Sequence, residues 1–328
     1  MAAFQIRKIQ SIIVFIIVLI AILWLFQDNI AKISVFQKNT QQFDTTKEEL
    51  LEYNNCMNDS KAITYLEKID NFLLKEYSNE QLLLHTIAAD TYYSYKNSPV
   101  QLCNIKLTLY DEVGQEGVVL TSNRSEIRKS GDIFFKDEIN IQSKNGALHE
   151  INTESLIVLS NSGQIISNSE VTYLGENAII HAQGMEMSNN DDTIFLVGDV
   201  IIEQDLGGVI ESRNLFISHA DGEKHYESEE RTIYRSIDNT INAEMGMDLD
   251  MNENLMQLLG KVEVLNSSGS KMNSYNLIVD QSNGGEVYKT NDSVHYQTGV
   301  SDIHAKRMHY DAKTKKVELM GGVLGVYK

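Results

Sequence analysis

The sequence predicts an all-β protein, an elongated array of stacked repeats that follows one N-terminal transmembrane helix and a short helical stalk. Three observations support this prediction. A four-residue pattern recurs at fixed spacing in the last two-thirds of the chain, and short runs rich in Val, Ile, Tyr and Thr alternate with turn residues from about residue 80 onward. The N-terminus, in contrast, carries one long apolar stretch.

The N-terminal apolar stretch has the length of a membrane-spanning helix. Residues 12–26 contain no polar side chain. About 18 residues at 1.5 Å each span roughly 27 Å, close to the thickness of the hydrocarbon core. Two basic residues precede the stretch, and no small-residue cleavage site follows Phe26. We therefore expect a cytoplasmic tail at residues 1–8 and an uncleaved anchor at residues 9–27, rather than a signal peptide.

A polar stalk is expected between the anchor and the first strand, at residues 28–64. Thr45 and Glu48 fit a capping box, so a short helix near residues 45–58 is predicted. The apolar residues from Ile63 to Leu73 are compatible with a continued helix or with entry into the first strand, and their periodicity does not decide between the two.

The rest of the chain reads as strands and turns. Clusters of Asn, Gly, Ser and Asp interrupt the β-branched runs, and no convincing helical window follows residue 80. The single proline, Pro99, leaves nearly every strand able to pair along both edges.

The repeat has the same internal spacing in each of three units. An aliphatic residue is followed by Met after 14 residues, by Gly after 13 more and by Val after another two, and the units lie 61–62 residues apart. Aliphatic landmarks at intervals of 29–33 residues extend the array back to about residue 80. Repeats of this length indicate a supersecondary unit stacked on copies of itself. The three units are Val171, Met185, Gly198 and Val200; Ile233, Met247, Gly260 and Val262; and Val294, Met308, Gly321 and Val323.

Period-2 alternation places further apolar residues on the same face as these landmarks, two positions after them, although Arg235 and Gly325 break the series. Such rows usually fill a dry core. In a wide β-array they can instead line an apolar groove, which flexible Met side chains would suit. The candidate lipid-binding residues are Leu107, Leu109, Ile139, Ile141, Val171, Tyr173, Met185, Val200, Ile202, Ile233, Met247, Val262, Val264, Val294, Tyr296 and Met308.

Composition argues against several other classes of function. The formal net charge of −18 disfavours nucleic-acid binding, which needs Lys and Arg at the phosphates. No nucleophile motif or paired carboxylates stand outside the repeat, so we expect neither an enzyme nor a cofactor. Cys56 and Cys103 are predicted to be unpaired, and the eight histidines show no ligand spacing, so no metal site is expected.

Several short motifs after the anchor resemble those of the LptC family of lipopolysaccharide-export proteins. The resemblance is carried by the order of the segments His85–Asp90, Ile133–Ile141, Ser167–Val171, His181–Met185 and Phe195–Val200. An LptC ends soon after the last of these segments. This chain continues through Asn242–Met247 and His304–Met308, and this continuation is similar to LptA and OstA-like modules.

The resemblance implies an OstA-like twisted β-jellyroll and a role in lipopolysaccharide transport. The chain would be a single-pass protein of the bacterial inner membrane with a periplasmic β-array. It would accept acyl chains from the ABC transporter formed by LptB, LptF and LptG, and pass them to LptA or another OstA-like module. The C-terminal strand is the expected docking edge, with Val323, Leu324, Val326 and Tyr327 as candidates.

The expected segments are therefore the tail, the anchor, the stalk, an LptC-like jellyroll at residues 65–205 and an LptA/OstA-like extension at residues 206–328. The alternative is a membrane-anchored structural β-solenoid with a dry core, and an enzyme built on a β-helix is a third, weaker interpretation.

Overall fold

The computed structural model describes residues 65–77, 81–110, 114–143, 150–159, 164–188, 193–219 and 224–327. These residues form an all-β, antiparallel structure, as the sequence predicts, and no helix occurs among them. No described helix is therefore long and apolar enough to cross a membrane. The expected anchor, stalk helix and cytoplasmic tail lie outside the described residues.

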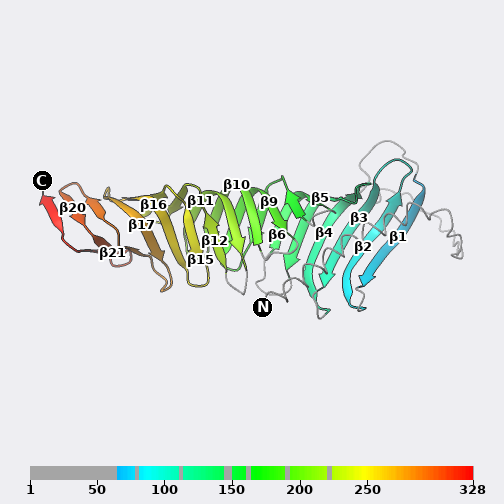
Figure 1. The fold of residues 1–328 in the computed structure, drawn as a ribbon, viewed down its shortest axis with the longest axis horizontal. Coiled ribbons are helices and arrows are strands. Elements are labelled where there is room, and N and C mark those ends of the chain that lie inside the picture. The colour runs from blue at the N-terminus through cyan, green and yellow to red at the C-terminus, as the bar shows by residue number, and fades with distance from the viewer. Residues whose placement is uncertain are drawn as a thin grey trace, which may run out of the picture. The chain divides into compact units, whose positions relative to one another are not determined.

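The chain divides into two compact units, which are described separately. Unit 1 comprises Met1–Asn145 and Thr153–Ile166, and unit 2 comprises Gly146–Asn152 and Ser167–Lys328. Unit 1 contains an antiparallel meander in which each of five strands pairs with the next (Figure 1). The strands of the meander are β1 (Glu67–Tyr77), β2 (Leu83–Ser94), β3 (Val100–Tyr110), β4 (Glu116–Ile127) and β5 (Ile133–Ser143), and β6 (Glu150–Val158) and β7 (Gln164–Ser167) follow them.

Unit 2 continues with long and short strands in a repeating order (Figure 1). The strands are β8 (Val171–Leu174), β9 (Ala178–Ser188), β10 (Thr193–Gln204), β11 (Val209–Ser218), β12 (His225–Ser228), β13 (Thr232–Arg235), β14 (Asn239–Ala243), β15 (Met247–Asp250), β16 (Leu255–Asn266), β17 (Lys271–Asp280), β18 (Val287–Thr290), β19 (Val294–Gln297), β20 (Ser301–Ala305), β21 (Arg307–Asp311), β22 (Lys316–Met320) and β23 (Leu324–Tyr327).

Each long strand of unit 2 contributes to two half-sheets. The first part of β11, Val209–Glu211, pairs with β13, whereas its last part, Phe216–Ser218, pairs with β12. Strand β16 is divided in the same way between β15 and β14, and β17 between β19 and β18. We call the half that contains β8, β13, β14, β19, β20 and β23 half-sheet A, and the half that contains β12, β15, β18, β21 and β22 half-sheet B.

The repeated glycine explains how a long strand passes from one half-sheet to the other. Gly198 in β10 and Gly260 in β16 lie at β-bulges, where the register shifts, and have φ of 84° and 76°. A side chain is strained at such angles, and glycine avoids that strain. The N–H groups of both glycines donate hydrogen bonds to the next long strand, to Asn214 Oδ1 (3.0 Å) and Asn276 Oδ1 (2.9 Å).

One position of the predicted repeat has a different register in the structure. In β13 the buried residues are Thr232 and Tyr234, and Ile233 points to the other face, where its cross-strand neighbours are Glu211 and Asn242. Tyr234 is therefore the counterpart of Tyr173. A slip of one residue moves every side chain of a strand to the opposite face, which is why Arg235 broke the predicted series.

The prediction of unpaired cysteines is wrong for Cys103. This residue lies buried in β3 and is disulfide-bonded. The other cysteine of the chain, Cys56, lies outside the described residues. Spacing alone did not indicate the pairing, because a disulfide requires two Cα atoms within about 7 Å, which sequence does not reveal.

Candidate functional site

The interior of unit 2 collects most of the candidate residues in one buried row. Ten of them have less than a tenth of their surface exposed, and Met185, Ile202, Met247 and Val262 have none. In its first two repeats the row is filled by its own side chains. The ten residues are Val171, Tyr173, Met185, Val200, Ile202, Met247, Val262, Val264, Val294 and Met308.

The four candidates in unit 1 are packed less uniformly. Ile139 and Ile141 are buried, whereas Leu107 and Leu109 are half-buried. Leu107 lies opposite Ile87 on one side and Leu120 on the other, and both of these neighbours are buried. The described part of unit 1 therefore leaves apolar surface accessible at Leu107.

The row in unit 2 opens toward its C-terminal end. Each recurrent methionine faces a leucine across the ladder, and the first two leucines, Leu196 and Leu258, are fully buried. Leu319, opposite Met308, is half-buried. Tyr296, the third residue in the series of Tyr173 and Tyr234, is half-buried as well. The third repeat therefore exposes surface that the first two bury.

A cleft of about 220 Å³ lies at this open end, and we call it the C-terminal cleft. Apolar and aromatic side chains line one part of it, namely Val264, Met272, Tyr288, Tyr296, Met308, Tyr310 and Val317. Its remaining lining is polar and includes Lys271 and Lys315, together with Asn and Ser side chains. Both lysines are ion-paired, Lys271 with Glu263 and Lys315 with Asp238, so their positive charges are compensated beside the apolar part of the cleft.

Elsewhere the interior is closed by hydrogen bonds between half-sheets A and B, along a margin that we call the mouth. The hydroxyl of Tyr173 in β8 is hydrogen-bonded to Nε2 of His219, the residue after β11 (3.0 Å). The hydroxyl of Tyr234 in β13 accepts a hydrogen bond from Gln281, the residue after β17 (2.9 Å). The two bridges are equivalent, because the tyrosines lie 61 residues apart and their partners 62 apart. The same type of hydrogen bond therefore closes the mouth in successive repeats.

Glu286 links the bridges around the second repeat. Its carboxylate accepts hydrogen bonds from Tyr234 (2.5 Å) and from Tyr288, and Tyr288 in turn accepts one from Asn239 (3.1 Å). Burial, first of all, and then the nearby Glu286 raise the pKa of the Tyr234 and Tyr288 hydroxyls. Both phenols therefore stay protonated and donate to the carboxylate.

Two ion pairs also cross the mouth. Lys224 pairs with Glu176, and Lys315 pairs with Asp238 (2.5 Å). Each pair has one well-exposed partner, Glu176 (65%) or Lys315 (62%), and such pairs contribute little to stability individually. They mark where the two half-sheets meet and can separate without leaving a buried charge.

Exposed apolar side chains stand at the turns on the half-sheet A side of the mouth. Leu206, Ile237 and Val300 are exposed by 54%, 100% and 64%. Their turns join β10 to β11, β13 to β14 and β19 to β20. The three residues therefore place exposed apolar surface along one margin of unit 2.

The last two strands of unit 2, β22 and β23, have a strand partner on one side only among the described residues. In the first two repeats, β10 and β16 each pair with a long strand on their far side, β11 and β17. The equivalent pieces of the third repeat, β22 and β23, pair with β21 and β20, and the structure describes no strand on their far side. All four predicted docking residues are exposed there by more than half.

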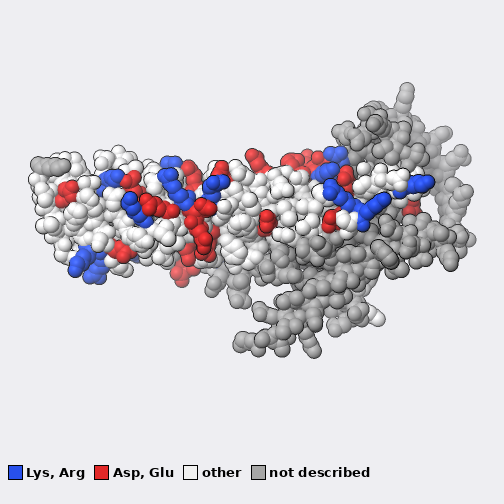
Figure 2. Space-filling model, turned by 45° about the horizontal axis from the view of Figure 1, so that its top comes forward, with Lys and Arg blue, Asp and Glu red and all other residues white. Residues whose placement is uncertain are grey.

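Charged side chains of both signs lie on the outer surface of the described residues (Figure 2). Figure 2 shows Lys and Arg interspersed with Asp and Glu on the displayed face. Cross-strand pairs such as Arg235–Glu211 (2.9 Å) and Lys289–Asp280 (2.7 Å) account for part of this pattern. Hydrogen bonds from Lys289 and Ser282 lower the pKa of Asp280 to about 2. The outside is thus solvated and the inside apolar.

Comparison with known families agrees with this architecture. The sequence model described as "Lipopolysaccharide-assembly, LptC-related" matches residues 12–205 and 226–328. The chain belongs to the LptC-related family. Members take part in lipopolysaccharide transport in the bacterial envelope, and the family is one of transport proteins rather than enzymes. The C-terminal segment of this LptC-related chain, expected to resemble LptA, matches the same family model. The chain has no significant match among curated proteins.

The structure of the LptC-related chain also brings together residues that the sequence did not single out. Tyr234, Gln281 and Glu286 meet at the mouth, although they lie up to 52 residues apart. The recurrence of Tyr173 and Tyr234 at the repeat spacing is the sequence signal for this bridge, and it is hidden because the aliphatic Ile233 beside Tyr234 faces outward.

Proposed function

We propose that this LptC-related chain carries the acyl chains of lipopolysaccharide along its apolar interior and passes them to a β-module docked on β22 and β23. The observation that carries the proposal is the continuous buried row of unit 2, which opens at the C-terminal cleft. Each acyl methylene removed from water is stabilised by about 0.8 kcal/mol, so a multi-acyl lipid needs such a path across an aqueous compartment.

Entry into the first two repeats requires the mouth to open, because their interior is filled. The bridges across it are hydrogen bonds and exposed ion pairs, which water can replace when the half-sheets separate. The row of Leu206, Ile237 and Val300 is then the first apolar surface that an acyl chain meets. Sugars and phosphates remain outside, beside the charged surface.

Docking at the C-terminal edge is supported by the far side of β22 and β23, which has no strand partner among the described residues. A strand from a neighbouring module would take the place that β17 occupies beside β16, and would extend both the sheet and the apolar row. LptA, another OstA-like module or a second copy of this chain fits this role. In unit 1, β1 pairs with β2, and Leu73 of β1 and Leu66 just before this strand are exposed. We propose this edge of unit 1 as the one that faces the LptB, LptF and LptG transporter.

The proposed location is the inner membrane, with residues 9–27 as the anchor and the β-units in the periplasm. The division into an LptC-like part to residue 205 and an LptA/OstA-like part from residue 206 belongs to the same proposal. In this arrangement the C-terminal repeats form the first part of the chain of β-modules that leads away from the inner membrane.

Photo-crosslinking from two matched pairs of positions tests the proposal. Ile202 faces the interior and is fully buried, whereas Ile201 on the opposite face is 42% exposed. Met308 lines the cleft, and Arg307 beside it is exposed. A photoreactive residue at Ile202 or Met308 should give lipopolysaccharide adducts in exporting cells, and one at Ile201 or Arg307 should not.

The pattern of adducts separates the alternatives. Adducts at both inward positions indicate transport through the whole interior, whereas adducts at Met308 alone restrict the lipid to the cleft. The packed first two repeats are also what a structural β-solenoid would show. The lack of adducts at every inward position would therefore favour the scaffold and contradict lipid carriage.

A further inference from the structure

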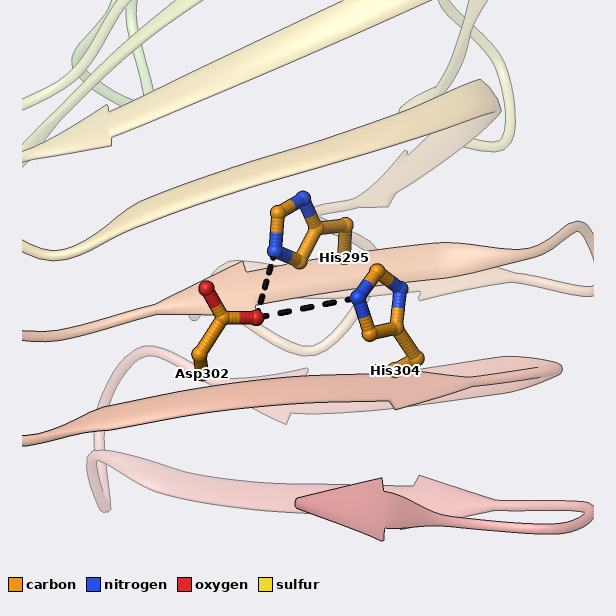
Figure 3. A group of neighbouring side chains, drawn as sticks. All are labelled: His295, Asp302 and His304. Atoms are coloured by element: carbon orange, nitrogen blue, oxygen red, sulfur yellow. Dashed lines mark hydrogen bonds and ion pairs between the residues drawn. The ribbon is translucent and has the colours of Figure 1, made fainter. Parts of the chain in front are cut away.

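Four side chains lie on one face of the β19–β20 hairpin, and Figure 3 shows three of them, His295, Asp302 and His304. His295 lies directly opposite His304, and Gln297 lies directly opposite Asp302. Residues two apart in a strand share a face, and directly opposite residues have Cβ atoms about 5 Å apart. The hairpin therefore holds the four side chains on rigid strands rather than on a loop.

The three ionisable members point their ligand atoms at one place. His295 Nε2 lies 2.7 Å from Asp302 Oδ1, and His304 Nε2 lies 3.7 Å from the same oxygen, as the dashed lines of Figure 3 show. The imidazole rings stack with centroids 4.2 Å apart and an angle of 8° between their planes. All three ligand atoms lie within 4.8 Å of one another.

We propose that His295, Asp302 and His304 bind a divalent transition-metal ion, with Zn²⁺ as the ion that the ligand set fits best. Two imidazole nitrogens and one carboxylate oxygen are ligands that Zn²⁺ takes at about 2.0–2.2 Å. Ligand atoms within 4.8 Å of one another can reach one such ion by small side-chain rotations. This inference does not depend on lipid transport.

Gln297 acts as a positioning residue for the site. Its Nε2 donates a hydrogen bond to Asp302 Oδ2 (2.9 Å) and leaves Oδ1 directed at the two histidines. Outer partners of this kind orient metal ligands in many proteins.

The surroundings leave room for a fourth ligand. About a third of His295 and Asp302 and 60% of His304 are exposed. A shallow depression that both histidines line adjoins the site, and Lys261 and Lys306 line it too. Their positive charges oppose the ion, so we expect a weaker site than a closed four-ligand one. Water or a side chain of a partner can complete the coordination.

The site lies one strand from the open edge. Strand β20, which carries Asp302 and His304, is hydrogen-bonded to β23, with Asp302 opposite Val326 and His304 opposite Leu324. An ion that joins β19 to β20 would therefore stiffen the support of the C-terminal edge strand, whatever binds there.

Calorimetric titration of the full chain in detergent with ZnCl₂ tests the inference. The protein is prepared without a polyhistidine tag and stripped with chelator. We expect one saturable site, and for His304→Ala and His295→Ala a dissociation constant raised at least about tenfold. His225→Ala is the matched control, since His225 lies 3.4 Å from Asp248 in a two-residue pair and its loss should leave the titration unchanged.

Binding of Co²⁺ provides a second readout, because a histidine-containing tetrahedral site gives a visible absorption band that surface adsorption does not. Gln297→Ala should weaken the binding while retaining the band. All variants change partly exposed side chains, and circular dichroism checks that they fold. The inference is overturned if the wild-type chain shows no saturable site, or if His304→Ala and His295→Ala bind Zn²⁺ as tightly as His225→Ala.

Discussion

Met247 lies directly opposite Leu258 in the β15–β16 ladder, and neither side chain has any exposed surface. The same pair occurs one repeat earlier as Met185 and Leu196, also fully buried. The recurrent methionine is thus a core residue in the closed state of the interior. A thioether side chain that packs tightly here could still adapt to an acyl chain when the mouth opens.

Substitution of Met247 should destabilise unit 2 through a cavity. Met247→Ala removes a fully buried side chain, and we expect a loss of about 2–5 kcal/mol in the free energy of unfolding. Met245→Ala, two residues away and 57% exposed, should change it by less than about 0.5 kcal/mol. Urea denaturation followed by circular dichroism measures both. Equal effects would contradict the burial of Met247.

Removal of one hydroxyl should loosen the mouth. Tyr234→Phe keeps the buried ring but leaves Gln281 without its acceptor and Glu286 without one donor. A loss of about 1–3 kcal/mol is expected, because a buried polar group then lacks a partner. The variant should also bind an environment-sensitive fluorescent fatty acid more readily. Tyr275→Phe, at an exposed outer tyrosine, should do neither, and equal fatty-acid binding by both variants would refute the role of the bridge.

The strands and the positions of the recurrent glycines could be predicted from the sequence, because both depend on the local conformation of the chain. Alternation follows from the two faces of a strand, and Gly198 and Gly260 recur because their backbone needs positive φ. Inward and outward residues of a short strand are harder to assign. In β13 a threonine and a tyrosine face inward while the aliphatic Ile233 faces outward, so hydrophobicity alone selects the wrong face.

Contacts between strands are harder to predict for a different reason, because they depend on strand register and on how the half-sheets pack. His295, Asp302 and His304 meet because β19 and β20 pair in one particular register, and a shift of one residue would place them on opposite faces. Tyr234 and Glu286 meet because two half-sheets close on each other. The histidine pair with Asp302 leaves no recurrent spacing, whereas the bridging tyrosine recurs at the repeat spacing as Tyr173 and Tyr234.

Stability at acidic pH should depend on a buried histidine in unit 1. His85 is fully buried, with Nε2 3.3 Å from Glu76 Oε2, and burial lowers the pKa of His85 to about 4. The unfolded chain takes up this proton near pH 6.5. The contribution of His85 to stability is therefore complete above about pH 6.5 and is lost as the pH falls toward 4, and it amounts to about 3 kcal/mol.

Glu76 acts in the opposite sense. Burial raises the pKa of its carboxyl, so its contribution is present at low pH and is lost as the pH rises through the pKa of the folded state. In the wild type, His85 makes the free energy of unfolding rise as the pH increases from about 4 to 6.5, and His85→Leu should remove this rise. The decrease with pH that Glu76 contributes should remain. Thermal unfolding across this range measures the difference, with exposed His181→Leu as the control. If the stability of His85→Leu depends on pH as that of the wild type does, His85 is not the source of the pH dependence.

Peptide mapping should find Cys103 joined to Cys56, the other cysteine of the chain. A bond between residues 47 positions apart removes about 4 kcal/mol of chain entropy from the unfolded state. Reduction should therefore lower the unfolding temperature of the wild type but not that of Cys103→Ser. Recovery of the Cys103 peptide unlinked under non-reducing conditions would contradict the pairing.

A positive charge on the C-terminal edge should prevent docking by strand addition. Val326 of β23 is 60% exposed on a strand whose far side has no described partner, whereas Val300 is 64% exposed in a turn. Lysine on an edge strand opposes pairing with a second strand, because pairing would desolvate its charge. Val326→Lys should therefore abolish protein crosslinks from a photoreactive residue at Met320, and Val300→Lys should retain them. Mass spectrometry of the wild-type adduct distinguishes an OstA-like module from a second copy of the chain. Crosslinks that survive Val326→Lys, or that Val300→Lys removes equally, would show that the neighbour binds elsewhere.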